Sequence, residues 1–183
     1  ILLWSAAAAI ALGLSMQIGF ITHHVTLAQP LIGTEGAGFL VSAAGGSAFV
    51  GRLILARIVD GVAVRKLACL VMIAQSAALL SLAAWPTVPV LIGASLVYGY
   101  GIGHITTLGP IIVRREFGAA AFGATYGAAA SVIQLTTAFG PALFGVLRDT
   151  FGDYRPGLAI ASAVTLAACL ILFFGGRLAA TRT

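Results

Sequence analysis

The chain alternates between six long apolar runs and short segments rich in Pro, Gly and charged residues. A helix needs roughly 20 mostly apolar residues to cross the hydrocarbon core of a bilayer, and each run comes close to that length. The pattern therefore predicts an all-α membrane protein with six transmembrane helices. The predicted spans cover residues 1–27, 38–57, 67–84, 88–113, 119–146 and 158–175.

Helix-breaking residues mark the predicted ends of these spans. The first span is expected to end at Gln29 and Pro30, with residues 33–36 as the turn, because proline and glycine interrupt helices. The third span ends before Pro86 for the same reason. Residues 179–183 predict a short polar tail. Loops this short leave no room for a soluble domain.

The composition indicates burial in a bilayer. Of the 183 residues, 60% are hydrophobic and 8% are charged, whereas soluble domains are about 45–50% apolar and about 25% charged. The net charge of +5 comes from basic residues scattered singly or in pairs, so it does not predict a nucleic-acid partner. Cys69 and Cys169 lie inside apolar runs without metal-binding or redox spacing, and we expect neither a metal nor a cofactor.

The positions of Lys and Arg predict the orientation of the chain, because cytoplasmic loops carry an excess of basic residues. Seven basic residues follow the even-numbered spans and two follow the odd-numbered ones. The seven are Arg57, Arg65, Lys66, Arg114, Arg115, Arg177 and Arg182, and the two are Arg148 and Arg155. This bias predicts a multi-pass protein of the cell (inner) membrane with both termini of this segment in the cytoplasm.

The sequence contains an internal repeat. Residues 24–30 begin with His-Val-Thr and end in Pro, and they match residues 104–110, which begin with His-Ile-Thr and end in Pro. Residues 51–60 likewise resemble residues 140–149. Spans one to three thus repeat as spans four to six, and because three is odd the two copies have opposite topology. The predicted repeats cover residues 1–86 and 87–178.

Two motifs carry a resemblance to a known family. The set Gly51, Arg52, Leu53, Arg57, Asp60, Arg65 and Lys66 resembles the cytoplasmic loop motif of the major facilitator superfamily. The glycines and Pro141 within residues 122–154, which end in Gly-Asp-Tyr, are similar to the last two helices of its monocarboxylate-porter branch. An inverted three-plus-three repeat within six spans is also found in each half of these transporters.

The resemblance implies the C-terminal half of a transporter, helices seven to twelve, with an N-terminal half before Ile1 as its partner. It implies a secondary transporter that moves a small organic anion, above all a monocarboxylate, by alternating access and without enzymatic activity. The residues Gly51, Arg57, Asp60, Arg65 and Lys66 would form a loop that gates the cytoplasmic side. Gly61 stands where the family motif has a basic residue, which would weaken that gating.

Polar residues inside the spans are the candidates for substrate binding, because ionisable groups in a bilayer are costly and are retained for function. The resemblance implies that Arg52 binds the substrate carboxylate through its bidentate guanidinium. The alternative is a structural arginine that reaches toward the cytoplasmic end. Gln134 is the only amide of the fifth span, which lacks the lysine found there in the oxalate–formate antiporters of this branch. A dicarboxylate substrate is therefore disfavoured.

His24 and His104 occupy equivalent places in the repeat, and the resemblance implies that their helices line a central cavity. Each could bind a carboxylate or carry the proton of H⁺-coupled transport, with Gln17 and Tyr100 on the same helix faces. The alternative is that they bond neighbouring helices together. His23 points about 100° away from His24 and cannot share its face. No Asp or Glu lies deep in a span, so the proton group is a histidine here or a residue of the N-terminal half.

Two other functions fit the same pattern. An exporter of drugs on the same scaffold would bind apolar solutes through aromatic and apolar side chains, with Arg52 in a structural role. A complete six-span membrane protein, such as a channel subunit, would have no N-terminal half. The sequence upstream of Ile1 separates the last possibility from the first two.

Overall fold

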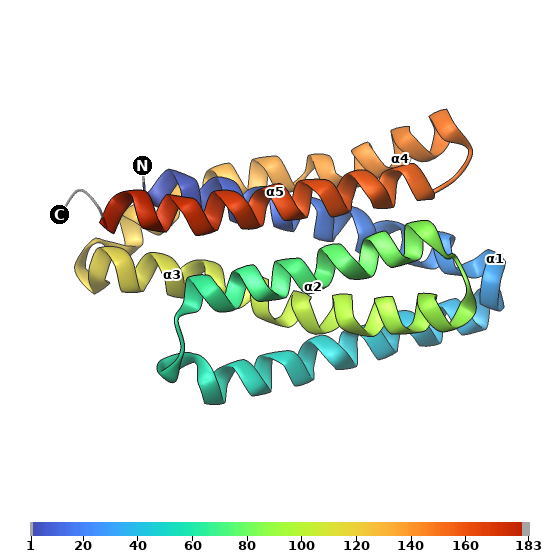
Figure 1. Ribbon diagram of the computed structural model, residues 1–183, viewed down its shortest axis with the longest axis horizontal. Coiled ribbons are helices and arrows are strands. Elements are labelled where there is room, and N and C mark those ends of the chain that lie inside the picture. Colours follow the sequence, from blue (N-terminus) through green and yellow to red (C-terminus); the bar gives the residue numbers. More distant parts are fainter. Residues whose placement is uncertain (1, 181–183) are drawn as a thin grey trace.

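The computed structural model describes residues 2–180, and for residues 176–180 it describes the backbone alone. The described chain is helical almost throughout and contains no strand (Figure 1). Its elements are α1 (Leu2–Ile58), the short 3-10 helix η1 (Val59–Gly61), α2 (Val64–Ala84), α3 (Val88–Thr137), α4 (Phe139–Phe151) and α5 (Arg155–Ala180). Residues 179 and 180 of the predicted tail continue α5, whereas Arg182 and the side chain of Arg177 lie outside what is described.

Helices α1 and α3 each reverse direction at one glycine. Gly33 has φ 74° and ψ 173°, and Gly118 has φ 77° and ψ 166°, a conformation that glycine adopts readily because it has no Cβ. Figure 1 shows α1 turning back at one end of the molecule and α3 at the opposite end. The first and second arms are residues 2–32 and 34–58 of α1, and residues 88–117 and 119–137 of α3.

Glycines, and not prolines, end these arms. The predicted turn at Gly33 is present, but the predicted break at Gln29 and Pro30 was wrong, because the chain stays helical through Pro30 to residue 32. A proline removes one hydrogen bond from a helix and can bend it, whereas a reversal needs the positive φ of Gly33. Pro110 lies inside α3 in the same way.

The helical stretch after Gly118 is longer than the sequence predicted. The second arm of α3 passes into α4 at Ala138, which keeps a helical conformation with φ −61° and ψ −24°. Helix α4 then continues past the predicted end at Val146 to Phe151, where Gly152 with φ 71° terminates it. The added residues include Arg148 and Asp149, so charged residues did not end the helix, and a left-handed glycine was again the end signal.

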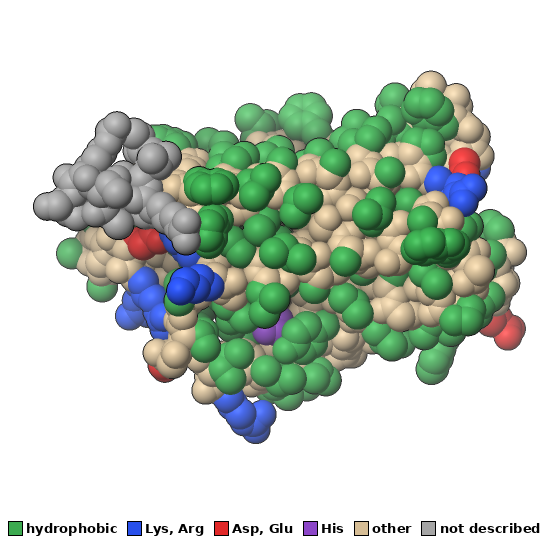
Figure 2. Space-filling model, viewed as in Figure 1, with side chains coloured by type: hydrophobic (Ala, Val, Ile, Leu, Met, Phe, Trp, Pro, Cys, Tyr) green, Lys and Arg blue, Asp and Glu red, His purple; other side chains and the backbone are tan. Residues whose placement is uncertain are grey.

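Within the described residues, four helical stretches are long and apolar enough to cross a membrane, namely Leu2–Gly61, Val64–Ala84, Val88–Phe151 and Arg155–Gly175. Figure 2 shows hydrophobic side chains along the length of the helices and charged side chains at the two ends. Phe39 is 78% exposed and Leu135 is 68% exposed. So many exposed large apolar side chains favour a surface that contacts lipid over one that contacts water. This agrees with a multi-pass membrane protein.

Close helix crossings at glycines hold the arms together. A Cβ on Gly140 of α4 would overlap the carbonyl oxygen of Ser15 in the first arm of α1. A Cβ on Gly103, in the first arm of α3, would overlap the carbonyl oxygen of Ala48 in the second arm of α1. Small residues that allow backbones to approach are a common means of packing helices in membranes.

Helices α2 and α5 pack antiparallel through reciprocal contacts. The hydroxyl oxygen of Ser76 lies 3.0 Å from the carbonyl oxygen of Ser162, and the hydroxyl oxygen of Ser162 lies 2.9 Å from the carbonyl oxygen of Ser76. Each Sγ of Cys69 and Cys169 lies 3.6 Å from the other residue's carbonyl oxygen. Both cysteines are therefore buried thiols in a helix interface, as expected for small apolar residues.

Candidate functional site

His24 is buried inside the bundle and connects two helices. It lies on the first arm of α1 with 3% of its surface exposed. Its Nε2 forms a 2.8 Å hydrogen bond with the hydroxyl of Ser95 on the first arm of α3, and its ring packs 4.9 Å from that of Phe20. This contact is of the kind that the alternative interpretation of the histidines described, a polar link between neighbouring helices.

His104 and Tyr100 form a second buried polar group. His104 is 1% exposed, and its Nδ1 donates a 3.0 Å hydrogen bond to the carbonyl oxygen of Tyr100 on the same helix. The two rings are 4.6 Å apart. Gly51 makes room for both residues, since a Cβ there would lie 2.6 Å from the Tyr100 carbonyl oxygen and 3.1 Å from His104 Nδ1. The structure thus brings together three of the predicted functional residues.

Gln17 is the most unusual polar residue of the interior. It is 1% exposed, and neither its amide oxygen nor its amide nitrogen has a hydrogen-bond partner among the described residues. By contrast, Gln75 of α2 donates to the carbonyl oxygen of Tyr98 at 3.3 Å. A buried amide without partners costs about 1–3 kcal/mol, so its presence favours a role other than stability.

Arg52 and Gln134 lie on exposed surface. The backbone of Arg52 packs against α3, where a Cβ on Gly103 would lie 3.1 Å from the Arg52 nitrogen, but its side chain points outward. The Arg52 guanidinium has no hydrogen bond or ion pair within the part of the chain that the structure describes. Gln134 lines a hollow of about 410 Å³ between the first arm of α1 and both arms of α3, together with Thr106 and Tyr126.

His23, to which the sequence analysis assigned no role, connects the first arm of α1 to α4 and to the loop before α5. Its Nε2 donates to the carbonyl oxygen of Pro141 in α4 at 3.1 Å, and its Nδ1 lies 3.1 Å from the hydroxyl of Tyr154 before α5. Because His23 and His24 point in different directions from the helix, they bind different partners: His23 contacts Pro141 and Tyr154, and His24 contacts Ser95. The sequence signal for this contact was the Gly-Asp-Tyr segment of residues 152–154, because it contains Tyr154.

The predicted gating loop lies in a charged cluster at the end of the bundle that holds the N-terminus. Asp60 forms a 3.1 Å ion pair with Arg115 at the end of the first arm of α3. Arg115 also donates to the carbonyl oxygens of Val59 and Val62, at 2.8 and 3.2 Å. The predicted residues Arg57 and Lys66 are exposed at the same end, where Figure 2 shows several blue side chains together.

Arg65 is the best-anchored residue of this cluster. Its guanidinium binds both carboxylate oxygens of Glu116, with an Nη2–Oε2 distance of 2.9 Å. It also donates to the carbonyl oxygens of Leu172 in α5 at 2.7 Å and Leu2 in α1 at 3.4 Å. The two side chains are 15% and 18% exposed. The sequence analysis did not predict Glu116 and Arg115 as members of the cluster. Their charges are opposite to those of Arg65 and Asp60, with which they pair, and this complementarity was the available signal.

No protein-family model matches the chain, and no curated protein matches it significantly. The resemblance to the major facilitator superfamily therefore rests on the sequence motifs themselves.

Proposed function

We propose that this chain is a six-span unit of a secondary transporter, arranged as an inverted three-plus-three repeat, which moves a small organic anion by alternating access. The observation that carries the proposal is that corresponding spans of the sequence repeat cross each other at glycines. The glycine crossing at Gly19 and Gly140 joins the first arm of α1 to α4, and the crossing at Gly99 and Ala44 joins the first arm of α3 to the second arm of α1. Each pairs the first span of one repeat with a second span.

The third helix of each repeat supports the same symmetry. Helices α2 and α5 meet each other through the reciprocal contacts of Ser76 and Ser162, as expected for elements on either side of a two-fold axis. Inverted repeats of this kind are common in secondary transporters, whose substrate sites lie between the repeats near the middle of the bilayer.

The substrate class follows from the polar groups that the bundle retains. Arg52 supplies a guanidinium without a partner among the described residues, and its planar fork suits a carboxylate. Gln17 and the His104–Tyr100 pair add polar atoms to a predominantly apolar interior. One cation with a few neutral polar groups favours a monocarboxylate over a dicarboxylate or an apolar drug.

The remaining parts of the proposal concern orientation and partners. The charged cluster around Arg65 lies at the cytoplasmic side of the cell (inner) membrane, together with both termini of this segment, in accord with the excess of basic residues there. The outward side of Arg52 faces an N-terminal half of the same transporter. H⁺ is the candidate coupling ion, with His24 or His104 as its carrier in this unit.

The test is substrate binding by Arg52 variants of the full-length protein. Arg52→Ala should weaken the affinity for a monocarboxylate on the order of 100-fold and abolish uptake, because an anion in a poorly solvated cavity loses its counter-charge. Arg52→Lys keeps the charge without the fork, so its loss should be smaller. Affinity is measured by scintillation proximity beside a melting temperature. Normal affinity in a folded Arg52→Ala protein would remove the carboxylate assignment and favour the drug-exporter alternative.

A further inference from the structure

Three hollows open at the two ends of the bundle, one at the reversal of α1 and two at the reversal of α3, and the sequence repeat relates the two ends. One, of about 300 Å³, is lined by Thr26, Pro30 and Leu31 near the reversal of α1. At the other end, two adjoining hollows of about 340 and 450 Å³ share Ile111 near the reversal of α3, and Pro110 lines the first of them. Ile111 lies eighty positions after Leu31, and Pro110 eighty after Pro30. Each repeat therefore contributes a similar hollow to its own end of the molecule.

A pair of arginines lines the hollows at each end of the bundle, and one member of each pair is tied to the backbone. In the hollow near α1, Arg155 donates to the carbonyl oxygens of Ala83 and Ala84 at 2.9 and 3.1 Å, which closes the end of α2. At the α3 end, Arg115 is tied in the same manner to two carbonyl oxygens of the η1 region and to Asp60. Both of these arginines hold loops in place.

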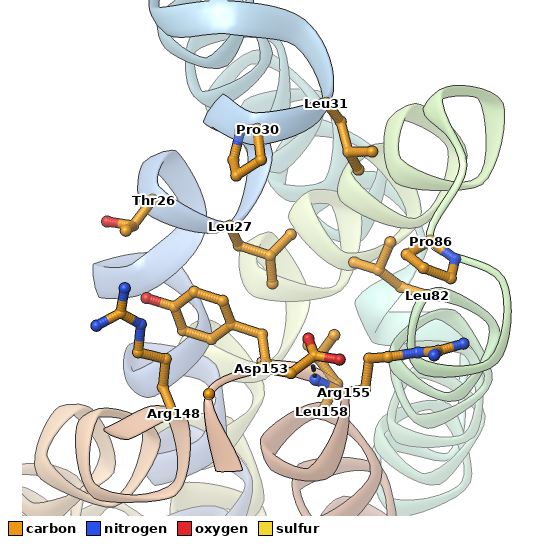
Figure 3. Close-up of a pocket in the computed structure, with 12 residues that line it drawn as sticks. Thr26, Leu27, Pro30, Leu31, Leu82, Pro86, Arg148, Asp153, Arg155 and Leu158 are labelled. Carbon is orange, nitrogen blue, oxygen red and sulfur yellow. Dashed lines mark hydrogen bonds between the residues drawn. The ribbon is translucent and has the colours of Figure 1, made fainter. Parts of the chain in front are cut away.

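The second arginine of each pair is free to meet a solute. Arg114 lines both hollows at the α3 end, and it makes no hydrogen bond or ion pair with any described residue. Arg148 has one partner, Asp149, at 3.1 Å, and the side chains are 51% and 74% exposed. An ion pair as exposed as this is worth about 0–1 kcal/mol, so an anion can compete for Arg148. Figure 3 shows Arg148 rising beside the hollow, across from Arg155.

We infer that Arg148 and Arg114 are the anion-capture residues of two entry vestibules, one on each side of the membrane. This inference rests on the proposed transport of small organic anions and adds how the anion reaches the central site from either side. A positive group at the mouth of an apolar hollow raises the local concentration of anions and speeds their entry, and salt weakens the effect. Substrate contact at Arg52 is a separate, central step.

The charges around the vestibules predict that they differ in strength. Asp149 and Asp153 lie beside Arg148 and Arg155, so the acidic and basic residues around this hollow are equal in number. At the α3 end Asp60 is the acidic residue that lines the hollow, against Arg114 and Arg115. The capture effect should therefore be larger for Arg114 than for Arg148.

The experiment measures initial rates of uptake by the full-length protein in proteoliposomes of known orientation, with a labelled monocarboxylate supplied to one face at a time. At low ionic strength, Arg148→Gln should raise KM for uptake from one face and Arg114→Gln should raise KM for uptake from the opposite face, each about threefold to tenfold. Arg148→Lys and Arg114→Lys keep the charge and should stay near the wild-type KM. These two lysine variants serve as the matched controls, because each removes the same guanidinium but keeps the positive charge at its hollow.

Three outcomes decide the matter. The vestibules are supported if Arg148→Gln and Arg114→Gln raise KM for uptake from opposite faces and if both increases vanish at high salt. Unchanged KM values at both faces, in proteins that still lose uptake with Arg52→Ala, overturn the vestibules and leave the proposed function intact. An absence of saturable monocarboxylate uptake in the wild-type protein overturns the proposed function and the vestibules together.

Discussion

The regions around His24 and His104 correspond in the sequence repeat but differ in their hydrogen bonds. His24 is bonded across helices to Ser95. The repeat would pair His104 with Ser15, eighty positions before Ser95, yet His104 bonds to a carbonyl of its own helix and Ser15 bonds to the carbonyl oxygen of Thr136 at 3.1 Å. The glycine crossings are alike in both regions, whereas the polar connections are not.

This difference separates the features of the repeat that fix the backbone packing from the polar contacts that can vary between the two copies. A glycine crossing fixes how closely two backbones pack, and any side chain there causes a clash. A buried hydroxyl or imidazole needs a partner, but several partners satisfy it equally well. Function can therefore diverge between repeats through polar side chains while the backbone packing is kept.

The largest effect is expected from Gly140→Ala. Its Cβ would overlap the Ser15 carbonyl oxygen, so the helices must separate at a cost of about 3 kcal/mol. Gly103→Ala, at the matching crossing, should cost a similar amount because its Cβ meets the Ala48 carbonyl oxygen. Thermal unfolding in detergent measures both, with Gly127→Ala as the control in open space. If only one variant is destabilised, the two crossings do not play the same part.

A second prediction extends the comparison to the end of the bundle. Glu116→Gln leaves the largely buried Arg65 without its carboxylate and should lower the free energy of unfolding by about 2 kcal/mol. Asp60→Asn removes the partner of Arg115, but Asp60 is 97% exposed, and the change should cost less than about 0.5 kcal/mol. Melting temperatures of the two variants give the contrast. Equal losses would show that burial does not set the strength of these pairs.

The smallest effect is expected within the histidine regions themselves. A double-mutant cycle of His24→Ala and Ser95→Ala should give a coupling energy of about 1 kcal/mol, since the cycle isolates their hydrogen bond. The cycle of His104→Ala and Ser15→Ala should give a coupling near zero, because each bonds elsewhere. Unfolding in mild denaturant measures both cycles. A matching coupling in the second cycle would mean that the repeat is symmetric in its polar contacts as well.

The helix boundaries next to Pro86 could be read from the sequence, whereas several others lie three to five residues from the predicted positions. The predicted end of the third span at Ala84 and the predicted start of the fourth at Val88 are both confirmed, because Pro86 ends one helix and Pro89 begins the next. Pro30 was wrongly predicted to end a helix, because the hydrophobic pattern does not show whether a proline lies inside a helix or at its end. Reversal depends on a positive φ, which the sequence gives only as a choice among many glycines.

The candidate polar residues could be selected from the sequence, but their contacts could not be predicted. Apolar surroundings identified Gln17, His24, His104 and Arg52 as candidates. Their partners depend on how the helices rotate against one another, and the near-uniform apolar character of α1 and α3 contains little information about rotation. The roles assigned to these residues in substrate binding and gating stay predictions until they are measured.

The serine contacts between α2 and α5 act as a lock on register. Sliding one helix along the other by a single residue, about 1.5 Å, would break both Ser76–Ser162 contacts at once and move Cys69 off the Cys169 carbonyl oxygen. Rotation of either helix has the same result, because each hydroxyl reaches only the face that it now touches. We therefore expect the two helices to move together, with any conformational change occurring between this pair and its neighbours.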